Sequence, residues 1–363
     1  MIDFRYHLVS IVAVFLALAI GIVLGSTELQ GHTIDLLQST SNGLKNSLNA
    51  ANAQHHSDQQ AINADQQFLQ TAERRLLDKE LDGDRLVIIT EPGAPGSVID
   101  GIEQVAGIAG ATVTGVVALQ PKFNDLSGAT QSDLSGINST LASTDGTVLA
   151  AAAAPQTAYQ QQAAQLIATA ILDKPATTNS TSGSATSGSA TSGTASGLSA
   201  TAQTLLAAYE QAGYLTVSDV TMPATLAVIV TPQTVPADGQ NDPGNQVLLA
   251  LAQQFEIGSA ATIVVGSSAG SSPAGSAISV LRSSSVSGEV SSVDDADTTL
   301  GQISSIWALA AQKAGEKANS YGIWGGASAV SPVPLPELSA APTITPTPQK
   351  TAKGKGTTSV KKK

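Results

Sequence analysis

The stretch Arg85–Gly96 (RLVIITEPGAPG) joins a short, continuous apolar run to a turn rich in proline and glycine. A run of this kind is typical of a strand that is buried on both faces of a sheet. A helical pattern follows over Ser97–Ala109, and a second apolar run over Thr112–Leu119 ends before Pro121. A strand, a helix and a second strand in this order predict a βαβ unit with parallel strands.

The same pattern resumes further along the chain. We expect a helix near residues 200–212, a strand at 225–231, a helix at 245–255 and a strand at 261–266. Thr147–Ala154 fits a further strand, although its alanines make this assignment ambiguous. Short buried strands that alternate with helices predict an α/β, Rossmann-like domain with a mainly parallel sheet over residues 84–325.

Residues 176–200 interrupt this domain with serine, threonine, glycine and alanine, including two tandem copies of SATSG. Such a tract has almost no apolar surface to bury, so we expect a disordered insertion. The tract could instead separate two domains, but neither half alone has enough strands for a covered sheet. Residues 332–363 are rich in proline, threonine and alanine and then in lysine, and we expect them to be disordered as well.

Upstream of the domain, Leu8–Leu24 (LVSIVAVFLALAIGIVL) is long and apolar enough to cross a membrane. At about 1.5 Å per residue it spans roughly 25–29 Å, close to the thickness of a hydrocarbon core of ~30 Å. We predict a single-pass signal anchor in the cell membrane over residues 8–26. Arg5 then keeps residues 1–7 in the cytoplasm and exports the remainder. The alternative is a cleaved secretory signal, for which the run is long and Val23–Gly25 is a poor cleavage site.

Residues 33–82, between the anchor and the domain, predict one long helix, because they contain no proline and a single glycine. Two rows of side chains recur every seven residues: Leu48, His55, Ile62, Leu69 and Leu76 in one, and Leu37, Leu44 and Ala51 in the other. Such heptads favour a coiled-coil stalk and a parallel homo-oligomer. The alternative is an amphipathic helix that folds back onto the domain.

Composition narrows the function. The formal net charge is −11, although six lysines lie in residues 350–363, so an acidic body carries a basic tail. This distribution argues against a nucleic-acid partner, which requires a basic face on the folded part. The chain has no cysteine, which excludes disulfides, thiolate nucleophiles and cysteine-based metal sites.

One serine motif suggests catalysis, but its surroundings do not. Gly266–Gly270 (GSSAG) matches the G-x-S-x-G pattern and follows a predicted strand. All four histidines of the chain precede the domain: His7, His32, His55 and His56. Because a serine nucleophile needs a base, we expect no enzymatic activity. Gly93–Gly96 (GAPG) fits no phosphate-binding pattern, and we interpret it as a turn.

The adjacent pair His55 and His56 is a weak candidate for a metal site. A dimer would bring four imidazoles together, and Asp58 adds an oxygen ligand nearby. Neighbouring residues on a helix point about 100° apart, so one chain does not chelate well through both rings. A polar face of the stalk is the simpler interpretation.

A second weak candidate is the acidic cluster Asp294, Asp295 and Asp297. These carboxylates could hold a hard cation or perform acid–base chemistry. They could equally begin a helix over Thr298–Trp307, where the macrodipole stabilises acids in the first turn. Tyr321-Gly322 would then close that helix with a left-handed glycine. The residues alone predict no cofactor.

Two parts of the chain resemble the mycobacterial copper transport protein B family of actinobacteria. At the N-terminus the similarity lies in Met1–Ser10 (MIDFRYHLVS) and Phe15–Gly25 (FLALAIGIVLG). Towards the C-terminus it lies in Val280–Arg282, Ser292–Asp297, Gly301–Gln302, Ala308–Ala310 and Tyr321–Gly322. The resemblance covers residues 1–325 and implies a channel-forming envelope protein with a role in copper homeostasis.

Two functional hypotheses follow. The first is an anchored envelope protein that contributes to copper efflux as part of a channel or transport assembly; one membrane helix requires an oligomer to form a pore. The alternative is a non-catalytic envelope scaffold that presents an α/β interaction domain to partners on a coiled-coil stalk. Copper is implied by the resemblance only. Without cysteine and with two methionines, the exported domain is not expected to bind Cu(I) tightly.

Overall fold

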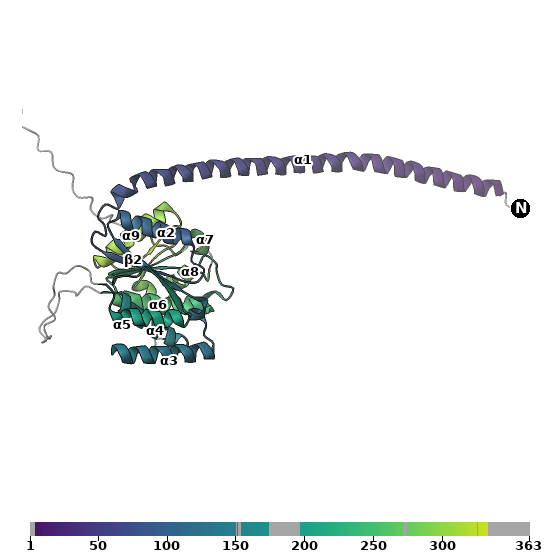
Figure 1. The fold of residues 1–363 in the computed structure, drawn as a ribbon. Helices are drawn as coiled ribbons and strands as arrows, with labels where there is room; N and C mark the ends of the chain where they lie inside the picture. The colour runs from purple at the N-terminus through teal and green to yellow at the C-terminus, as the bar shows by residue number, and fades with distance from the viewer. Residues whose placement is uncertain are drawn as a thin grey trace, which may run out of the picture. The chain divides into compact units, whose positions relative to one another are not determined.

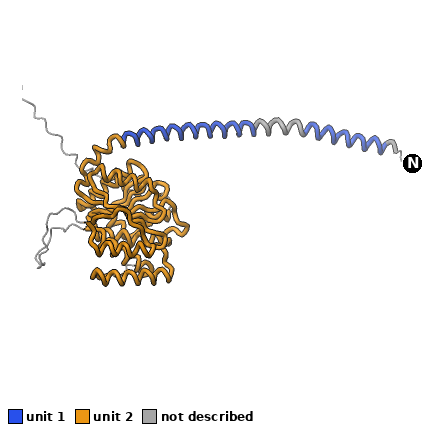
Figure 2. Tube along the Cα trace, in the orientation of Figure 1, with its two compact units in different colours: residues 1–68 blue, residues 69–363 orange. Residues whose placement is uncertain are grey.

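The computed structural model describes residues 4–149, 151, 154–173, 197–271, 274–324 and 326–332, with the backbone alone for residues 4–5 and 26–35. The chain divides into two compact units, Met1–Phe68 and Leu69–Lys363 (Figure 2). The predicted insertion at 176–200 and the predicted tail at 332–363 lie almost entirely outside the described residues. Their disorder therefore stays a prediction.

Helix α1 (Phe4–Leu76) contains the apolar segment expected at the N-terminus. Tyr6–Gly25 has a mean hydropathy of 2.9, and none of it is buried. Among the described residues, it is the single helical segment whose length and composition suit a membrane span. The predicted apolar helix over residues 8–26 is confirmed, although length and composition alone do not fix its topology.

Beyond the apolar segment, α1 continues through the range expected for a coiled coil. Leu37, Leu44 and Leu48 are 59–72% exposed in the single chain. The helix ends at Leu76 and not at residue 82. It stops there because the chain turns, with Lys79 at φ +64°, and buries Leu77 and Leu81 in the core of the second unit. The coiled coil itself stays a prediction.

The second unit is built on a sheet whose seven described strands have the order β3-β2-β1-β4-β5-β6-β7. The strands are β1 (Arg85–Thr90), β2 (Thr112–Leu119), β3 (Leu215–Ser218), β4 (Leu226–Val230), β5 (Ala261–Val265), β6 (Ser291–Val293) and β7 (Ser320–Tyr321). Neighbouring strands are parallel except β2 and β3, which pair antiparallel. The mostly parallel α/β fold is therefore confirmed.

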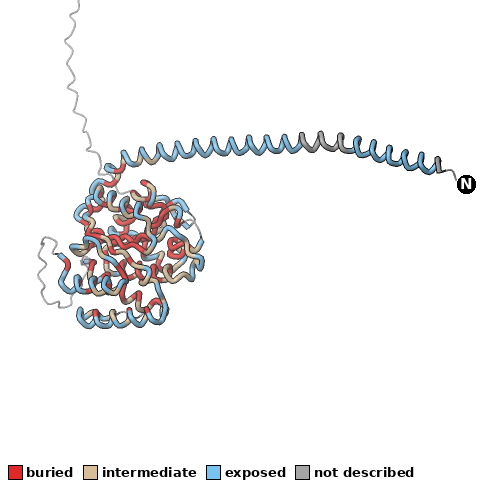
Figure 3. Tube along the Cα trace, turned by 45° about the vertical axis from the view of Figure 1, so that its right-hand side comes forward, coloured by how far each residue is buried: buried red, intermediate tan, exposed pale blue. Residues whose placement is uncertain are grey.

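Helices cover both faces of the sheet (Figure 1). One face carries α2 (Gly96–Ile108) and α9 (Thr299–Lys313). The other carries α4 (Ala158–Ile171), α5 (Ala200–Gln211), α6 (Pro243–Gly258) and α8 (Ala277–Ser283), and α3 (Gly128–Asp145) packs on α4. Side chains alternate between the two faces, which explains the continuous apolar runs of β1, β4 and β5. Buried residues concentrate on these central strands (Figure 3).

The structure contains four of the expected strands and three of the expected helices with bounds that differ by at most three residues. These strands were expected at 85–90, 112–119, 225–231 and 261–266, and these helices at 97–109, 200–212 and 245–255. The prediction of a strand at Thr147–Ala154 is wrong, since the described residues of that range form no strand. Pro155 instead begins a short 3-10 helix (Pro155–Thr157) that leads into α4, in keeping with the helix preference of alanine.

The expectation that Tyr321-Gly322 closes the last helix is also wrong. Helix α9 ends at Lys313, and the residue with positive φ that follows it is Gly315, at φ +92°. Tyr321 belongs instead to β7, the edge strand beside β6. Gly322 does adopt a φ of +128°, but it does so where the chain leaves the sheet.

Candidate functional site

Polar side chains gather at the carboxyl edge of the parallel sheet. Glu91 follows β1, Thr231 follows β4, Ser267 follows β5 and Asp294 follows β6. Parallel strands end at the same edge, so these side chains share it although they are far apart in the sequence. In open α/β sheets this edge is where ligands bind.

The order of the strands reverses between β1 and β4. The chain leaves β1 towards α2 on one face of the sheet and leaves β4 towards α6 on the other. A cavity of about 170 Å³ lies at this point. Its lining residues are Glu91, Pro92, Asn124, Pro232, Thr234, Pro236, Asp242, Gly244 and Asn245.

Glu91 is the most buried acid of this cavity, at 4% exposure. Its carboxyl group has no hydrogen-bond partner among the described residues. Burial, together with the negative charge of Asp242, raises the pKa of Glu91 to about 8. Glu91 is therefore mostly protonated at neutral pH.

Two further oxygens of the cavity belong to Asp242 and Asn124. Asp242 is the N-cap of α6, and its Oδ1 accepts a hydrogen bond from the Asn245 backbone N–H at 3.3 Å. Asn124 Oδ1 is buried and has no hydrogen-bond partner. A Cβ on Gly244 would lie 3.0 Å from both Asn124 Nδ2 and Asp242 Oδ1, so these side chains converge on the backbone of that glycine.

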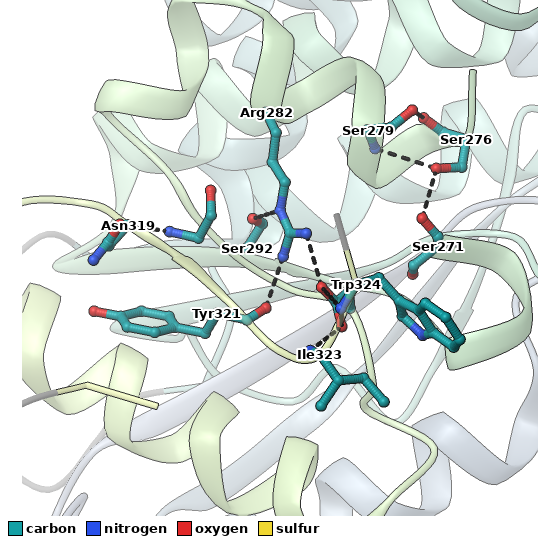
Figure 4. Close-up of polar contacts among 11 residues, drawn as sticks. Ser271, Ser276, Ser279, Arg282, Ser292, Asn319, Tyr321, Ile323 and Trp324 are labelled. Atoms are coloured by element: carbon teal, nitrogen blue, oxygen red, sulfur yellow. Dashed lines mark hydrogen bonds and ion pairs between the residues drawn. The ribbon is translucent and has the colours of Figure 1, made fainter. Parts of the chain in front are cut away.

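A second cluster of polar side chains, at the end of β6, surrounds Arg282 (Figure 4) and includes its ion-pair partner Asp294. The two form an ion pair of 2.8 Å between Arg282 Nη1 and Asp294 Oδ2, with side-chain exposures of 6% and 0%. Arg282 also donates from Nε to Ser292 Oγ at 3.0 Å and from Nη2 to the Tyr321 carbonyl at 2.7 Å. These bonds tie α8, β6 and β7 together.

The same carboxylate holds the chain that follows β7. Asp294 Oδ1 accepts the backbone N–H of Ile323 at 2.9 Å, and Oδ2 accepts that of Trp324 at 3.2 Å. Gly322 lies between this segment and β7, and a Cβ there would overlap the Asp294 carboxylate. Arg282, Asp294 and Gly322 therefore act as one structural unit.

The three acids of the predicted cluster lie in three different environments. Asp294 pairs with Arg282, whereas Asp297 is exposed and its Oδ1 accepts both the backbone N–H and the hydroxyl of Ser268 at 2.7 Å. Asp295 is buried, with Oδ1 unpartnered. Burial first, and then the charge of Asp294, raises the pKa of Asp295 to about 6. All three precede the N-cap of α9, Thr298, and none lies in the first turn of that helix.

The other predicted positions are not brought together by the fold. His55 and His56 are exposed on α1 in the first unit, with ring centroids 6.4 Å apart. No group of three histidine, cysteine, aspartate or glutamate residues among the described side chains could hold a metal ion. Ser268 begins the short helix α7 (Ser268–Ser271) directly after β5, but its hydroxyl donates to Asp297.

Sequence reasoning did not single out Glu91, Asn124 or Asp242 as site residues. Glu91 was visible as an acid directly after a buried strand, and Asp242 as an acid before Pro243 at a helix start. Neither signal reveals that the two carboxyl groups share a cavity, because more than 150 residues separate them.

A family model and two curated relatives identify the same family. A family model described as "Copper transport outer membrane protein, MctB" matches residues 1–332. The chain is 28% identical to the copper transporter MctB of Mycobacterium tuberculosis (strain ATCC 25618 / H37Rv) over 334 residues, which cover 91% of this chain and 99% of the relative. It is 26% identical to the copper transporter MctB of Mycobacterium leprae (strain TN), with the same coverage of both chains.

Proposed function

The chain belongs to the MctB family of copper transport outer membrane proteins, and from this premise we propose that it is a membrane-anchored envelope protein that serves copper homeostasis as a self-associating, non-catalytic part of a transport assembly. Residues 8–26, which lie mostly within the apolar segment Tyr6–Gly25, anchor the chain; residues 1–7 remain in the cytoplasm, and the α/β domain is exported. Copper is the cargo of the assembly. The alternative of a scaffold without a copper role differs from this proposal in the cargo, not in the architecture.

The observation that carries the proposal is the row of exposed apolar side chains on α1. Leu37 and Leu44 occupy d positions of the heptad, and Leu48 and Ile62 occupy a positions; all four are 47–72% exposed. Fully burying one such side chain contributes about 1.5–3 kcal/mol. Association of two or more copies through this row would therefore be favourable.

The row is shorter than the heptad pattern predicts. Leu69 and Leu76 continue it in sequence, but both are half-buried against the core of the second unit. The part available to another copy accordingly ends near Ile62. An anchor that confines the copies to one membrane raises their effective concentration and compensates for this short contact.

The side chains of the chain favour a structural contribution over copper binding by a single copy. Cu(I) prefers thiolate and thioether ligands. The sequence contains no cysteine, and Met222 is the one methionine after Met1. In the described residues, the acids at the end of β6 are engaged separately and the two histidines of α1 are neighbours on a helix. These features support a role that depends on assembly.

The absence of native cysteine allows a direct test of association. The full chain carrying Leu48→Cys, produced in its membrane, should form disulfide-linked dimers under mild oxidation, because a-position side chains meet in a parallel pair. The matched control is Asn46→Cys, which lies at the outermost heptad position of the same helix. Equal crosslinking of both variants, or none in either, would contradict the proposal.

The contribution to copper homeostasis requires a second measurement. Cells that produce only the Leu44→Glu/Leu48→Glu variant should accumulate copper like cells that lack the chain, since like charges at a and d positions prevent association. Cells with Asn46→Glu should behave like the wild type. Normal copper content in the double variant would separate copper homeostasis from association, and sub-micromolar stoichiometric Cu(I) binding by the full chain in detergent would contradict the non-binding role.

A further inference from the structure

The cavity between the ends of β1 and β4 has the position of a ligand site and an unusual charge. The loops after the two strands diverge to opposite faces of the sheet, which opens a crevice at the carboxyl edge. The charged residues of the lining are Glu91 and Asp242, and no basic residue accompanies them. The crevice therefore holds two acidic groups without a compensating positive charge, and Asp242 carries the negative charge while Glu91 is protonated.

Two of the side-chain acceptors that line this crevice lack hydrogen-bond donors. Glu91 is 4% exposed, and no hydrogen bond joins its carboxyl group to another described residue. Asn124 Oδ1 is buried without a partner. Asp242 accepts a single hydrogen bond, at 3.3 Å, from Asn245. Buried polar atoms in folded proteins nearly always have partners. The Glu91 carboxyl group and Asn124 Oδ1 are two acceptors without donors around one cavity, and with the Asp242 carboxylate beside them they point to a bound group of positive charge.

The acidic side chains of the crevice exclude phosphate groups, which are the ligands most often found at this position in the fold. Phosphates of nucleotides bind at the N-terminus of a helix that follows a strand, where backbone N–H groups are free. Here Asp242 already occupies the N-terminus of α6, and Glu91 adds a second acid. The charge of Asp242 would repel an anion and attract a cation, and a cation would add the charge of Glu91 by displacing its proton.

We propose that this crevice binds a hard divalent cation of the Mg²⁺, Ca²⁺ or Mn²⁺ class, with Glu91, Asp242 and the Asn124 side-chain oxygen as ligands. Carboxylate and amide oxygens are the donors that these ions prefer. A water occupies about 30 Å³ of liquid, so a cavity of about 170 Å³ accommodates the ion together with several waters. The proposal is independent of the role in copper homeostasis.

The protonation of Glu91 sets the pH dependence of this site. The pKa of about 8 means that an arriving cation displaces a proton from Glu91 at neutral pH. The affinity for the cation should therefore increase up to tenfold for each unit by which the pH is raised towards 8, and it should level off above pH 8. Asp242 is the other ionisable group of the lining, and it contributes to the raised pKa of Glu91.

The test uses the full chain in detergent and Mn²⁺ as the probe, followed by electron paramagnetic resonance at pH 6, 7 and 8. We expect one saturable Mn²⁺ per chain with a Kd below 1 mM at pH 8, and displacement by Ca²⁺ or Mg²⁺. Glu91→Gln and Asp242→Asn should each weaken binding at least tenfold. Asparagine still caps a helix, and glutamine has nearly the shape of glutamate, so both variants keep the fold.

Asp297→Asn is the matched control, because Asp297 lies at the same sheet edge outside the cavity. It should leave Mn²⁺ binding unchanged. Absence of saturable binding would overturn the proposal. So would loss of binding in Asp297→Asn with retention in Glu91→Gln, since that result would move the site to the end of β6. Circular dichroism of each variant confirms that the comparison is made between folded proteins.

Discussion

Asp294 and Glu91 both follow strands at the same sheet edge, and both are almost completely buried. Asp294 has every partner a carboxylate needs: a guanidinium at 2.8 Å and two backbone N–H groups. Glu91 has none and faces the charge of Asp242 instead. The two acids are therefore equally buried but differ in their partners and in their tendency to ionise. An ionised carboxylate stays buried only where a positive charge and hydrogen bonds compensate it.

The contrast separates structure from function at this edge. The Arg282–Asp294 pair closes the fold, and residues that carry the family resemblance, Arg282, Asp294 and Gly322, meet in it. The Glu91 cavity contributes no comparable contact. The motif recognised in the sequence thus contains the structural ion pair of Arg282 and Asp294. The candidate binding site, in contrast, consists of residues that no motif contains.

The largest expected effect on the free energy of unfolding comes from removing the Arg282–Asp294 ion pair. Arg282→Met removes the cation and leaves Asp294 as an unpaired charge in the interior, which should lower the free energy of unfolding by about 3–5 kcal/mol. Urea denaturation of the full chain in detergent measures this loss. Adding Asp294→Asn removes the stranded charge and should restore part of the stability. A loss below about 1 kcal/mol in Arg282→Met would mean that the pair is not structural.

The next effect concerns the glycine beside Asp294. Gly322→Ala places a methyl group against the Asp294 carboxylate at a φ of +128° and should cost about 2–4 kcal/mol. Gly315→Ala is the control, since its φ is also positive, at +92°, but nothing lies within 4 Å of the added methyl. It should cost only about 1 kcal/mol. Equal costs would show that backbone strain alone, not contact with Asp294, constrains Gly322.

The third prediction concerns Glu91. A carboxyl whose pKa is raised by folding stabilises the protein fully below its unfolded pKa, and this stability is lost as the pH rises through the folded value of about 8. At 1.36 kcal/mol per unit, about 2–3 kcal/mol should disappear between pH 5 and pH 7. Glu91→Gln should remove this component when unfolding is measured at both values in EDTA. Glu103→Gln, a half-buried glutamate on α2, should not.

The smallest effect is expected at Asp297. This acid is exposed, and its hydrogen bonds to Ser268 remain accessible to water. Asp297→Asn should change the free energy of unfolding by at most about 1 kcal/mol. A larger loss would place Asp297 with Asp294 among the structural acids of the edge.

Local patterns predicted most of the central fold. The runs at 85–90, 112–119, 225–231 and 261–266 became β1, β2, β4 and β5, because strands buried on both faces must be apolar throughout. The edge strands β3 and β7 and the neighbouring strand β6 were missed, because β3 has alternating exposure and β6 and β7 have only three and two residues. The alanines of Thr147–Ala154 were misleading, since they suit a helix as well as a strand.

The candidate site was predictable only in part. The sequence marked Asp294, Asp295 and Asp297 as one cluster, since they lie within four residues. The fold pairs the first with Arg282, buries the second and exposes the third. The sequence did not mark Glu91 with Asp242, whose proximity depends on the pairing of β1 with β4.

By itself, the sequence determined the apolar N-terminal helix, the parallel α/β core and the membership of its family, because each depends on local hydrophobicity or on motif identity. The tertiary structure decided which acids are paired and which are not. It also decided where the heptad row stops being available, since Leu69 and Leu76 pack on a core built from distant residues. Charge compensation and burial depend on neighbours in space, which the topology of the sheet assembles from separate parts of the chain.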